Sequence, residues 1–321
     1  MATRTEVGHH AELITRQQRG RLFLKKLVQQ RLLLLMALPF VLHIVLFRLG
    51  PVFGWIMAFQ DYRPGRGLFA QEWVGFEQFR YLFEDRGFWR VLRNTLAMAL
   101  IKLAMGTFFA ILVAVMINET RHRLFKRSVQ TISYLPHFVS WVVAANIVLE
   151  VLSPRGPVNN LLVSIGLLED PVLFMGQPQL FWWIIGWSHV WKTAGFGAII
   201  YLAAMTAIDP QLYESADMDG ASRLQRIWHI TLPGIRATVV ILLIINIGQL
   251  MEAGFEQQYL LQNGLVMDYS EVFRIYVLRW GLKLQRFSFA AAAGIFRSVV
   301  SVVLVMSANL LAKKMGEETL M

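Results

Sequence analysis

Residues 209–234 read DPQLYESADMDGASRLQRIWHITLPG, a polar stretch rich in helix start and stop signals. Its opening Asp-Pro pair predicts a helix start, because a carboxylate caps free amides and proline fits the first helical position. Gly220 suits the left-handed backbone conformation that ends many helices. Ser222 and Gln225 have the spacing of a capping box, which marks another helix start. The stretch is therefore predicted to form two short helices joined at Gly220.

Long apolar segments lie on both sides of this loop. Apolar residues make up 56% of the chain and charged ones 16%, with a mean hydropathy of +0.48. A soluble domain carries about 25% charged residues. Six stretches reach the roughly 20 residues that a helix needs to cross a hydrocarbon layer of about 30 Å. They are 32–59, 91–117, 129–152, 180–207, 237–255 and 289–312. The predicted fold class is an all-α membrane protein with six transmembrane helices.

Basic residues predict the direction of these spans, because Lys and Arg concentrate in cytoplasmic loops close to membrane helices. With the N-terminus inside, the internal segments hold 16 Lys and Arg, and the external segments hold 10. The internal segments are 1–31, 118–128, 208–236 and 313–321, and the external ones are 60–90, 153–179 and 256–288. Both termini and the loop are therefore predicted to be cytoplasmic. The same bias explains the net charge of +10 without a nucleic-acid partner.

The predicted organisation is a cytoplasmic segment 1–31, a membrane domain 32–312 that carries the loop 208–236, and a cytoplasmic tail 313–321. Cations and apolar residues are mixed in the first segment, which favours an amphipathic helix on the inner leaflet. A disordered basic tail is the alternative. The apolar run that follows is longer than a signal-peptide core and ends without a small-residue cleavage site, so the segment is expected to be retained.

The spacing in the loop resembles the EAA signature of the permeases of binding-protein-dependent ABC importers. That pattern is E-A-A, three residues, G, nine residues and I-x-L-P. The chain has Glu214-Ser215-Ala216, then Gly220, then Ile230-Thr231-Leu232-Pro233 at these spacings. Ser215 stands where alanine is usual and keeps the side chain small. The resemblance implies the type I ABC importer permease fold, with this loop as the cytoplasmic coupling helix that docks into a separate ATPase.

The resemblance also implies which residues meet the ATPase. Small side chains permit close approach, glycine turns the chain, and a glutamate offers a carboxylate to a basic partner. The residues so implied are Glu214, Ser215, Ala216, Asp219, Gly220, Ile230, Leu232 and Pro233. The sequence has no phosphate-binding loop of the form G-x4-G-K-[ST], so ATP and Mg²⁺ are expected on another polypeptide and no cofactor in this chain. No nucleophile–base arrangement and no metal-ligand spacing of histidines occurs, which predicts a subunit that is not an enzyme.

Softer motifs resemble the carbohydrate-uptake branch of this family, the permeases of oligosaccharide importers. They are Tyr134-Leu135-Pro136, the stretch WKTAGFG at 191–197 and YLAAM at 201–205. The resemblance implies a bacterial cytoplasmic (inner) membrane protein. Its implied partners are a second related permease, two ATPase subunits and an external solute-binding protein. Uronate oligosaccharides, such as alginate or aldouronate fragments, are the substrates that the resemblance suggests.

Polar and indole side chains inside the spans are candidates for the substrate path, because ionisable groups there usually face a cavity. Indoles stack on sugar rings, amides bond hydroxyls, and a lysine can pair with a substrate carboxylate. In the fifth span three polar residues recur on one helical face. The candidates are Trp187, His189, Trp191, Lys192, Asn246, Gln249, Glu252 and Asn146. Each has an alternative as a helix–helix hydrogen bond or intersubunit ion pair. Lys102 and Asn94 are further candidates, and Arg297 is a possible neutralising partner for Glu252.

Other classes of protein remain open at this stage. A secondary transporter driven by an ion gradient accounts for the spans and the buried charges, but not for the loop signature. It also predicts an internal repeat, which is not found. Within the importer family, permeases for amino acids, phosphate or metals share the loop, whereas the tryptophan-rich fourth span favours sugar. A membrane-embedded enzyme is disfavoured by the lack of a catalytic pattern.

Overall fold

The computed structural model describes residues 29–252, 254–314 and 316, and the chain divides into two compact units, Met1–Ile56 and Met57–Met321. The first unit contains α2 (Arg31–Ile44), the π-helical turn η1 (Val45–Leu49) and most of the 3-10 segment η2 (Gly50–Phe59). α2 is apolar on every face, as expected for a helix surrounded by lipid. The amphipathic helix predicted within 1–31 and most of the tail 313–321 lie outside the described residues.

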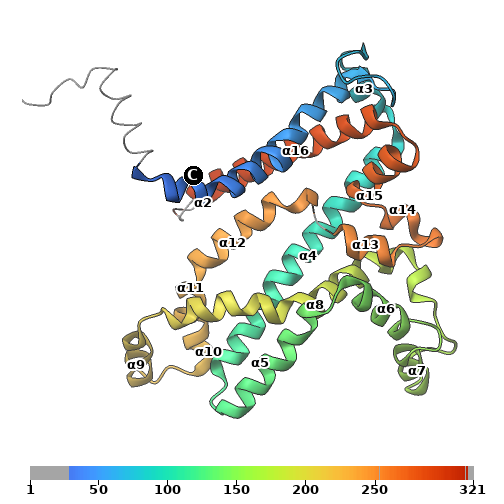
Figure 1. Ribbon diagram of the computed structural model, residues 1–321. Helices are drawn as coiled ribbons and strands as arrows, with labels where there is room; N and C mark the ends of the chain where they lie inside the picture. The colour runs from blue at the N-terminus through green and yellow to red at the C-terminus, as the bar shows by residue number, and fades with distance from the viewer. Residues whose placement is uncertain (1–28, 253, 315, 317–321) are drawn as a thin grey trace, which may run out of the picture. The chain divides into compact units, whose positions relative to one another are not determined.

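The second unit is almost entirely helical (Figure 1). In chain order its elements are β1 (Gln60–Asp61), β2 (Glu72–Trp73), α3 (Glu77–Glu84), α4 (Arg86–Glu119), α5 (Arg123–Phe138), α6 (Trp141–Val151), α7 (Pro157–Ser164), η3 (Phe174–Gly176), α8 (Pro178–Thr206), α9 (Pro210–Met218), α10 (Arg223–Arg226), η4 (Ile227–Thr231), α11 (Leu232–Gly234), α12 (Arg236–Gly248), η5 (Leu250–Glu252), α13 (Phe255–Leu261), η6 (Gly264–Val266), α14 (Met267–Ser270), α15 (Phe273–Leu278), η7 (Arg279–Lys283) and α16 (Phe287–Lys314). β1 and β2 pair antiparallel.

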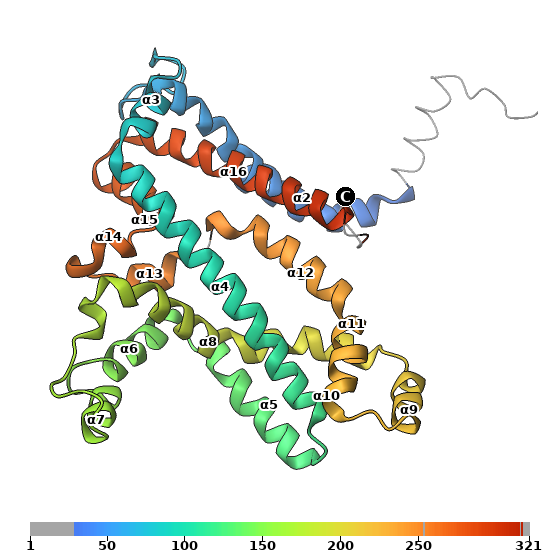
Figure 2. The same cartoon turned by 180° about the vertical axis from the view of Figure 1, so that it is seen from behind.

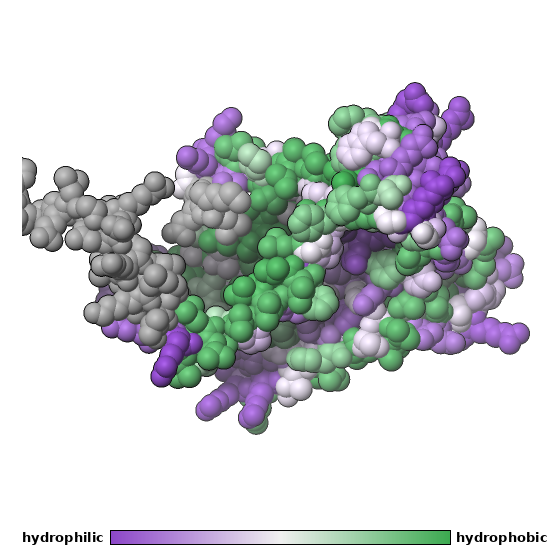
Figure 3. Space-filling model, turned by 45° about the horizontal axis from the view of Figure 1, so that its top comes forward, coloured by the Kyte–Doolittle hydropathy of each residue, from purple (hydrophilic) through white to green (hydrophobic). Residues whose placement is uncertain are grey.

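Among the described residues, three helical stretches are long and apolar enough to cross a membrane, namely Arg31–Phe59, Arg86–Glu119 and Phe287–Lys314. Three further stretches qualify if each bent helix pair counts as one span, with bends of 104° for α5–α6, 74° for α8–α9 and 55° before α12. These six stretches correspond to the six spans predicted from hydropathy. Figure 3 shows broad green apolar areas on this face, with purple hydrophilic side chains at its edges and in a hollow near the centre of the view.

α4 and α8 form the centre of the second unit, and α5 packs against α8 (Figure 2). Small residues let these helices approach closely, as in other membrane helix pairs. A Cβ at Gly195 of α8 would lie 2.5 Å from the carbonyl carbon of Ser133 in α5. Further along α8, Ala198 packs against Ala110 and Ala114 of α4 in one buried cluster. The backbone of α5 therefore lies against Gly195 of α8, and alanine side chains let α4 and α8 approach closely.

At the opposite end of α4, a buried ionic cluster attaches the α14–α15 segment. Glu271 is fully buried, and its carboxylate lies 3.2 Å from Arg279 Nε and 3.8 Å from Arg90. Burial raises the pKa of the Glu271 carboxyl, and the two guanidinium groups oppose this rise. Nearby, Asp85 caps α4 by accepting a hydrogen bond from the Gly87 amide at 2.9 Å, and it also accepts one from the Tyr276 hydroxyl. This end is therefore held by charge as well as by aromatic packing.

The third predicted span, 129–152, is not one helix. α5 ends at Phe138, Val139 has an extended backbone, and α6 starts again after Ser140 with a bend of 104°. Ser140 Oγ accepts a hydrogen bond from the Val143 amide at 3.3 Å and so caps the new helix. A serine cap inside an apolar run was too weak a signal to outweigh hydropathy. The prediction of a continuous helix over 129–152 is wrong.

The fifth predicted span, 237–255, is also interrupted. α12 ends at Gly248, and the chain continues through the short turn η5 before α13 begins after Gly254. Gly254 has a φ of +91°, which other residues rarely adopt. Non-helical backbone at membrane depth is tolerated where it lines a cavity or is buried in protein. The break between Gly248 and Phe255 therefore predicts a cavity at this depth.

Candidate functional site: a two-helix loop and a polar cavity

The loop 209–234 folds as its caps predict. Asp209 Oδ1 accepts a hydrogen bond from the Gln211 amide at 2.9 Å at the start of α9. Ser222 and Gln225 form the predicted capping box, with the Ser222 amide donating to Gln225 Oε1 at 2.7 Å. Gly220 has a φ of +74°, so the glycine turn between α9 and α10 is confirmed. Figure 1 shows α9 lying beyond the end of α8.

Contacts across the turn join the two short helices. Asp217 of α9 forms an ion pair with Arg226 of α10. The Tyr213 hydroxyl lies 3.0 Å from Oγ1 of Thr231, which is fully buried. The Ala221 amide donates to a carbonyl of α9 at 2.9 Å, in the manner of a glycine-terminated helix end. The loop is therefore one braced unit rather than two independent helices.

The residues assigned to ATPase docking divide into two groups. Glu214, Ser215, Asp219, Gly220 and Pro233 are exposed, whereas the remaining three are partly buried. The partly buried ones are Ala216, Ile230 and Leu232. Leu232 packs against the buried cluster that joins α4 and α8 next to the loop. The loop thus presents its first helix outward and attaches to the helix bundle through its second half.

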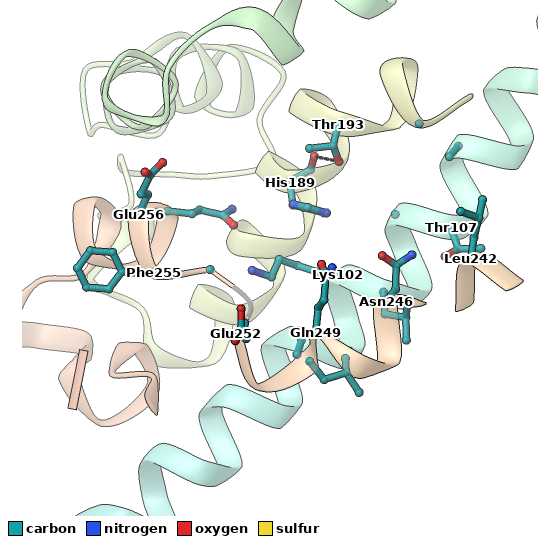
Figure 4. A pocket seen from close by; sticks show the side chains of 18 of the residues that line it. Lys102, Thr107, His189, Thr193, Leu242, Asn246, Gln249, Glu252, Phe255 and Glu256 are labelled. Atoms are coloured by element: carbon teal, nitrogen blue, oxygen red, sulfur yellow. Dashed lines mark hydrogen bonds between the residues drawn. The ribbon is translucent and has the colours of Figure 1, made fainter. Parts of the chain in front are cut away.

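A polar cavity of about 690 Å³ lies between α4, α8, α12 and the break at 249–254. α4 contributes small and polar residues, α8 contributes His189 and Thr193, and α13 contributes its first turn. Figure 4 shows the central lysine of this cavity, Lys102, between His189 above and Gln249 and Glu252 below in that view. The cavity is therefore built where the helix breaks, from spans that are distant in sequence.

The row predicted in the fifth span lies in this cavity. Asn246, Gln249 and Glu252 all line it, and all three are exposed. The Glu252 carboxylate lies 3.8 Å from the guanidinium of Arg297 in α16, which confirms the pairing that the sequence left open. His189 also lines the cavity. Four of the eight predicted path residues are thus brought together.

Lys192 lies elsewhere and has another partner. Its Nζ donates to the carbonyl oxygens of Pro136, His137 and Val139 at 3.3, 2.8 and 2.6 Å. These carbonyls belong to the end of α5, where helical partners are missing. A lysine that satisfies helix-end carbonyls is favourable both by hydrogen bonding and by the helix dipole. The structure therefore explains Lys192 as the cap of the broken third span.

Trp187, Trp191 and Asn146 are also outside the cavity. The two tryptophans are exposed and line a separate apolar groove of about 450 Å³ between α6 and α8. Asn146 is exposed and donates to the Val142 carbonyl of its own helix at 3.0 Å. Trp187 and Trp191 are four residues apart and share one face of α8, whereas His189 and Thr193 share the opposite face, and the sequence does not say which face meets the cavity.

Lys102 of α4, a further candidate from the sequence, also lines the cavity. Phe255, Glu256 and Arg274 line it as well and were not among the predicted path residues. Lys102 is 7% exposed. The guanidinium of Arg274 lies 5.3 Å from the centre of the Phe255 ring. Gly254, two residues after Glu252, was an available signal, since a glycine in a span can mark a helix break. No cluster of three or more possible metal ligands occurs among the described residues.

Comparison with known proteins identifies the wider group. The family described as "Binding-protein-dependent transport system inner membrane component" matches residues 106–317. The polygalacturonan/rhamnogalacturonan transport system permease protein YteP of Bacillus subtilis is 44% identical over 96% of this chain and 95% of its own length. Protein LplB of the same organism is 38% identical, over 94% and 95%.

A solved structure resembles the chain over nearly its whole length. It belongs to a bacterial ABC transporter involved in the import of the acidic polysaccharide alginate. The two chains are 42% identical, with a TM-score of 0.84, and the match covers 92% of this chain and 99% of the other. A second structure of the alginate transporter, in complex with a periplasmic protein that holds an alginate pentasaccharide, matches at 41% identity and the same TM-score.

Proposed function

We propose that this chain forms one half of an ATP-driven path for acidic oligosaccharides. The premise is that the chain belongs to the family of binding-protein-dependent transport system inner membrane components. It is a permease of a binding-protein-dependent ABC importer for sugars, with the type I permease fold. The finer proposal has three parts, namely the path, the coupling to an ATPase and the substrate.

The cavity is the observation that carries the proposal. Asn246 at the end of α12, and Gln249 and Glu252 just after it, are exposed at membrane depth, where lipid would leave the two amides without partners. A second, related permease that closes the same cavity from the other side gives these groups a polar environment. The cavity then becomes a path between two subunits, with room for sugar hydroxyls to bond to the amides.

The loop 209–234 supports coupling to a separate ATPase. Met218, Leu224 and Trp228 are 88%, 69% and 66% exposed on its two helices, which is apolar surface suited to a protein partner. The braces across the turn allow the loop to move as one piece when its partner moves. The lack of a phosphate-binding loop in the sequence supports an arrangement with two ATPase subunits that hold ATP and Mg²⁺.

The remaining topology follows from the distribution of charge. The basic segments favour both termini and the loop on the cytoplasmic side of the bacterial inner membrane. The segments around α3 and α13–α15 then face the other side. There they are available to an external solute-binding protein, and the alginate transporter is known in complex with such a periplasmic protein.

A panel of substrates tests the proposal. The complex of this chain with its second permease and ATPases is reconstituted, and ATP hydrolysis is measured with binding protein and with acidic or neutral oligosaccharides, amino acids or phosphate. We expect stimulation by acidic oligosaccharides such as uronate fragments. Stimulation by amino acids or phosphate alone would refute the carbohydrate assignment, and stimulation by neutral sugars alone would refute the acidic one.

A further inference from the structure

Lys102 is a buried cation that the fold does not neutralise. It lies near the middle of α4, is 7% exposed, and lines the polar cavity. Among the residues that the structure describes, no carboxylate lies within 4 Å of its Nζ. An ionisable group inside a membrane span is costly and is normally paired with a protein group or placed on a transport path.

The immediate surroundings of Lys102 are neutral. With the Gln258 amide oriented so that its nitrogen donates to the Gly254 carbonyl, its oxygen accepts from Lys102 Nζ at 3.2 Å. Nζ also lies against Gly254, where a side chain on the glycine would collide with it. An ammonium group has three protons to donate, and this arrangement uses one. The helix break therefore holds the lysine in place without cancelling its charge.

The other charged groups of the cavity have different surroundings. Glu252 lies 3.8 Å from Arg297 and is already paired. Arg274 and Glu256 are exposed and come from the segment that follows the break, with Arg274 stacked on Phe255. Lys192, the other buried lysine, is used by the α5 carbonyls. Lys102 is thus the buried charge that faces the cavity with no fixed counter-ion in the described part of the chain.

We propose that Lys102 Nζ is the counter-ion for a carboxylate on the sugar as it crosses the membrane, and so determines the preference for acidic over neutral oligosaccharides. This inference rests on the proposed function. A free ammonium on a flexible stem can follow a passing carboxylate, whereas a permanently paired one cannot. His189, Asn246 and Gln249 lie around the same cavity and can bond hydroxyls of the same sugar.

The test compares Lys102→Met, Lys102→Gln and Lys102→Arg with wild type in proteoliposomes. The two sugars are a uronate oligosaccharide and its partly carboxyl-reduced counterpart, each with saturating binding protein. Loss of a charge-assisted hydrogen bond predicts a fall of about 10- to 100-fold in uptake of the uronate for the Met and Gln variants. We expect a smaller fall for the reduced sugar and most activity retained by Lys102→Arg. Thr107→Val, which removes a neutral polar group from the same cavity wall, is the matched control.

Assembly is checked by co-purification of each variant with the second permease and the ATPase, in amounts expected to match wild type. Equal losses for both sugars, or full uronate uptake by Lys102→Met and Lys102→Gln, overturn the role of Lys102 and leave the importer intact. Variants that assemble poorly in both Met and Gln forms also overturn it, since the lysine is then structural. A wild-type complex that imports neither sugar refutes the proposed function itself.

Discussion

The contact between Gly195 and α5 gives a prediction that can be worked out from distances. An added Cβ at Gly195 would lie 2.5 Å from the Ser133 carbonyl carbon and 2.9 Å from its Cβ, and it would also meet the carbonyl oxygen. Ordinary contacts of this kind are about 3.4–4 Å, and the obstructing atoms are mainly backbone, which has no alternative rotamer. Gly195→Ala must therefore move α5 by about 1 Å.

Gly197→Ala is the matched control. Two residues further along the same helix, its added Cβ would meet only the Ala110 Cβ, at 3.4 Å. Both variants gain up to about 1 kcal/mol in helix propensity. Overpacking costs about 1–3 kcal/mol when it forces backbone shifts, and moving α5 also lengthens the Lys192 hydrogen bonds. We expect Gly195→Ala to be about 2–3 kcal/mol less stable than Gly197→Ala.

Thermal unfolding of the purified complex measures this difference. At roughly 2–4 °C per kcal/mol for a chain of this size, the Gly195→Ala midpoint should lie about 5–10 °C below that of Gly197→Ala. Uptake at a temperature between the two midpoints should fall in parallel. Equal midpoints for the two variants would refute the close approach of α5 and α8 and the packing account built on it.

Three further predictions concern the loop and the ionic cluster around Glu271. Gly220→Val forces a β-branched residue to a φ of +74°, so sugar uptake should fall more than about tenfold. Gly220→Asn tolerates that conformation and should retain most of the uptake. Equal uptake by the two variants would contradict the turn. Asp217→Arg and Arg226→Asp should each weaken coupling, measured as sugar imported per ATP hydrolysed. The double exchange should restore coupling, because it rebuilds the ion pair that braces the loop. A double exchange no better than either single variant would contradict this brace. Glu271→Ala leaves two half-exposed arginines without their buried partner and should lower the free energy of unfolding of the complex by about 2–3 kcal/mol. Glu271→Gln should lower it by less. An unchanged stability would contradict the role of the cluster.

The features that local chemistry determines could be predicted. The capping residues and Gly220 specify the two-helix loop within a short stretch of chain, and the structure forms those caps. The spans follow from hydropathy, because the length of an apolar run is a local property. The row of Asn246, Gln249 and Glu252 was also readable from its three-residue spacing. All three line the cavity, although α12 ends at Gly248 and only Asn246 lies within it.

The features that depend on how helices meet could not be predicted. Lys102 and Lys192 look alike in sequence, each a single lysine in an apolar helix. Only packing decides that Lys192 meets the end of α5 while Lys102 meets the cavity. That end of α5 exists because the third span breaks at Ser140, and the cavity exists because the fifth breaks before Gly254. A hydropathy average extends through both breaks and so conceals them.

The source of energy for uptake tests the central claim most directly. Proteoliposomes that contain the complex of this chain with its second permease and ATPases are supplied with labelled oligosaccharide and binding protein outside. They receive either ATP and Mg²⁺ on the ATPase side or a proton or sodium gradient without ATP. The account predicts accumulation against a concentration gradient with ATP and none with the ion gradient. Accumulation driven by the ion gradient without ATP would contradict it.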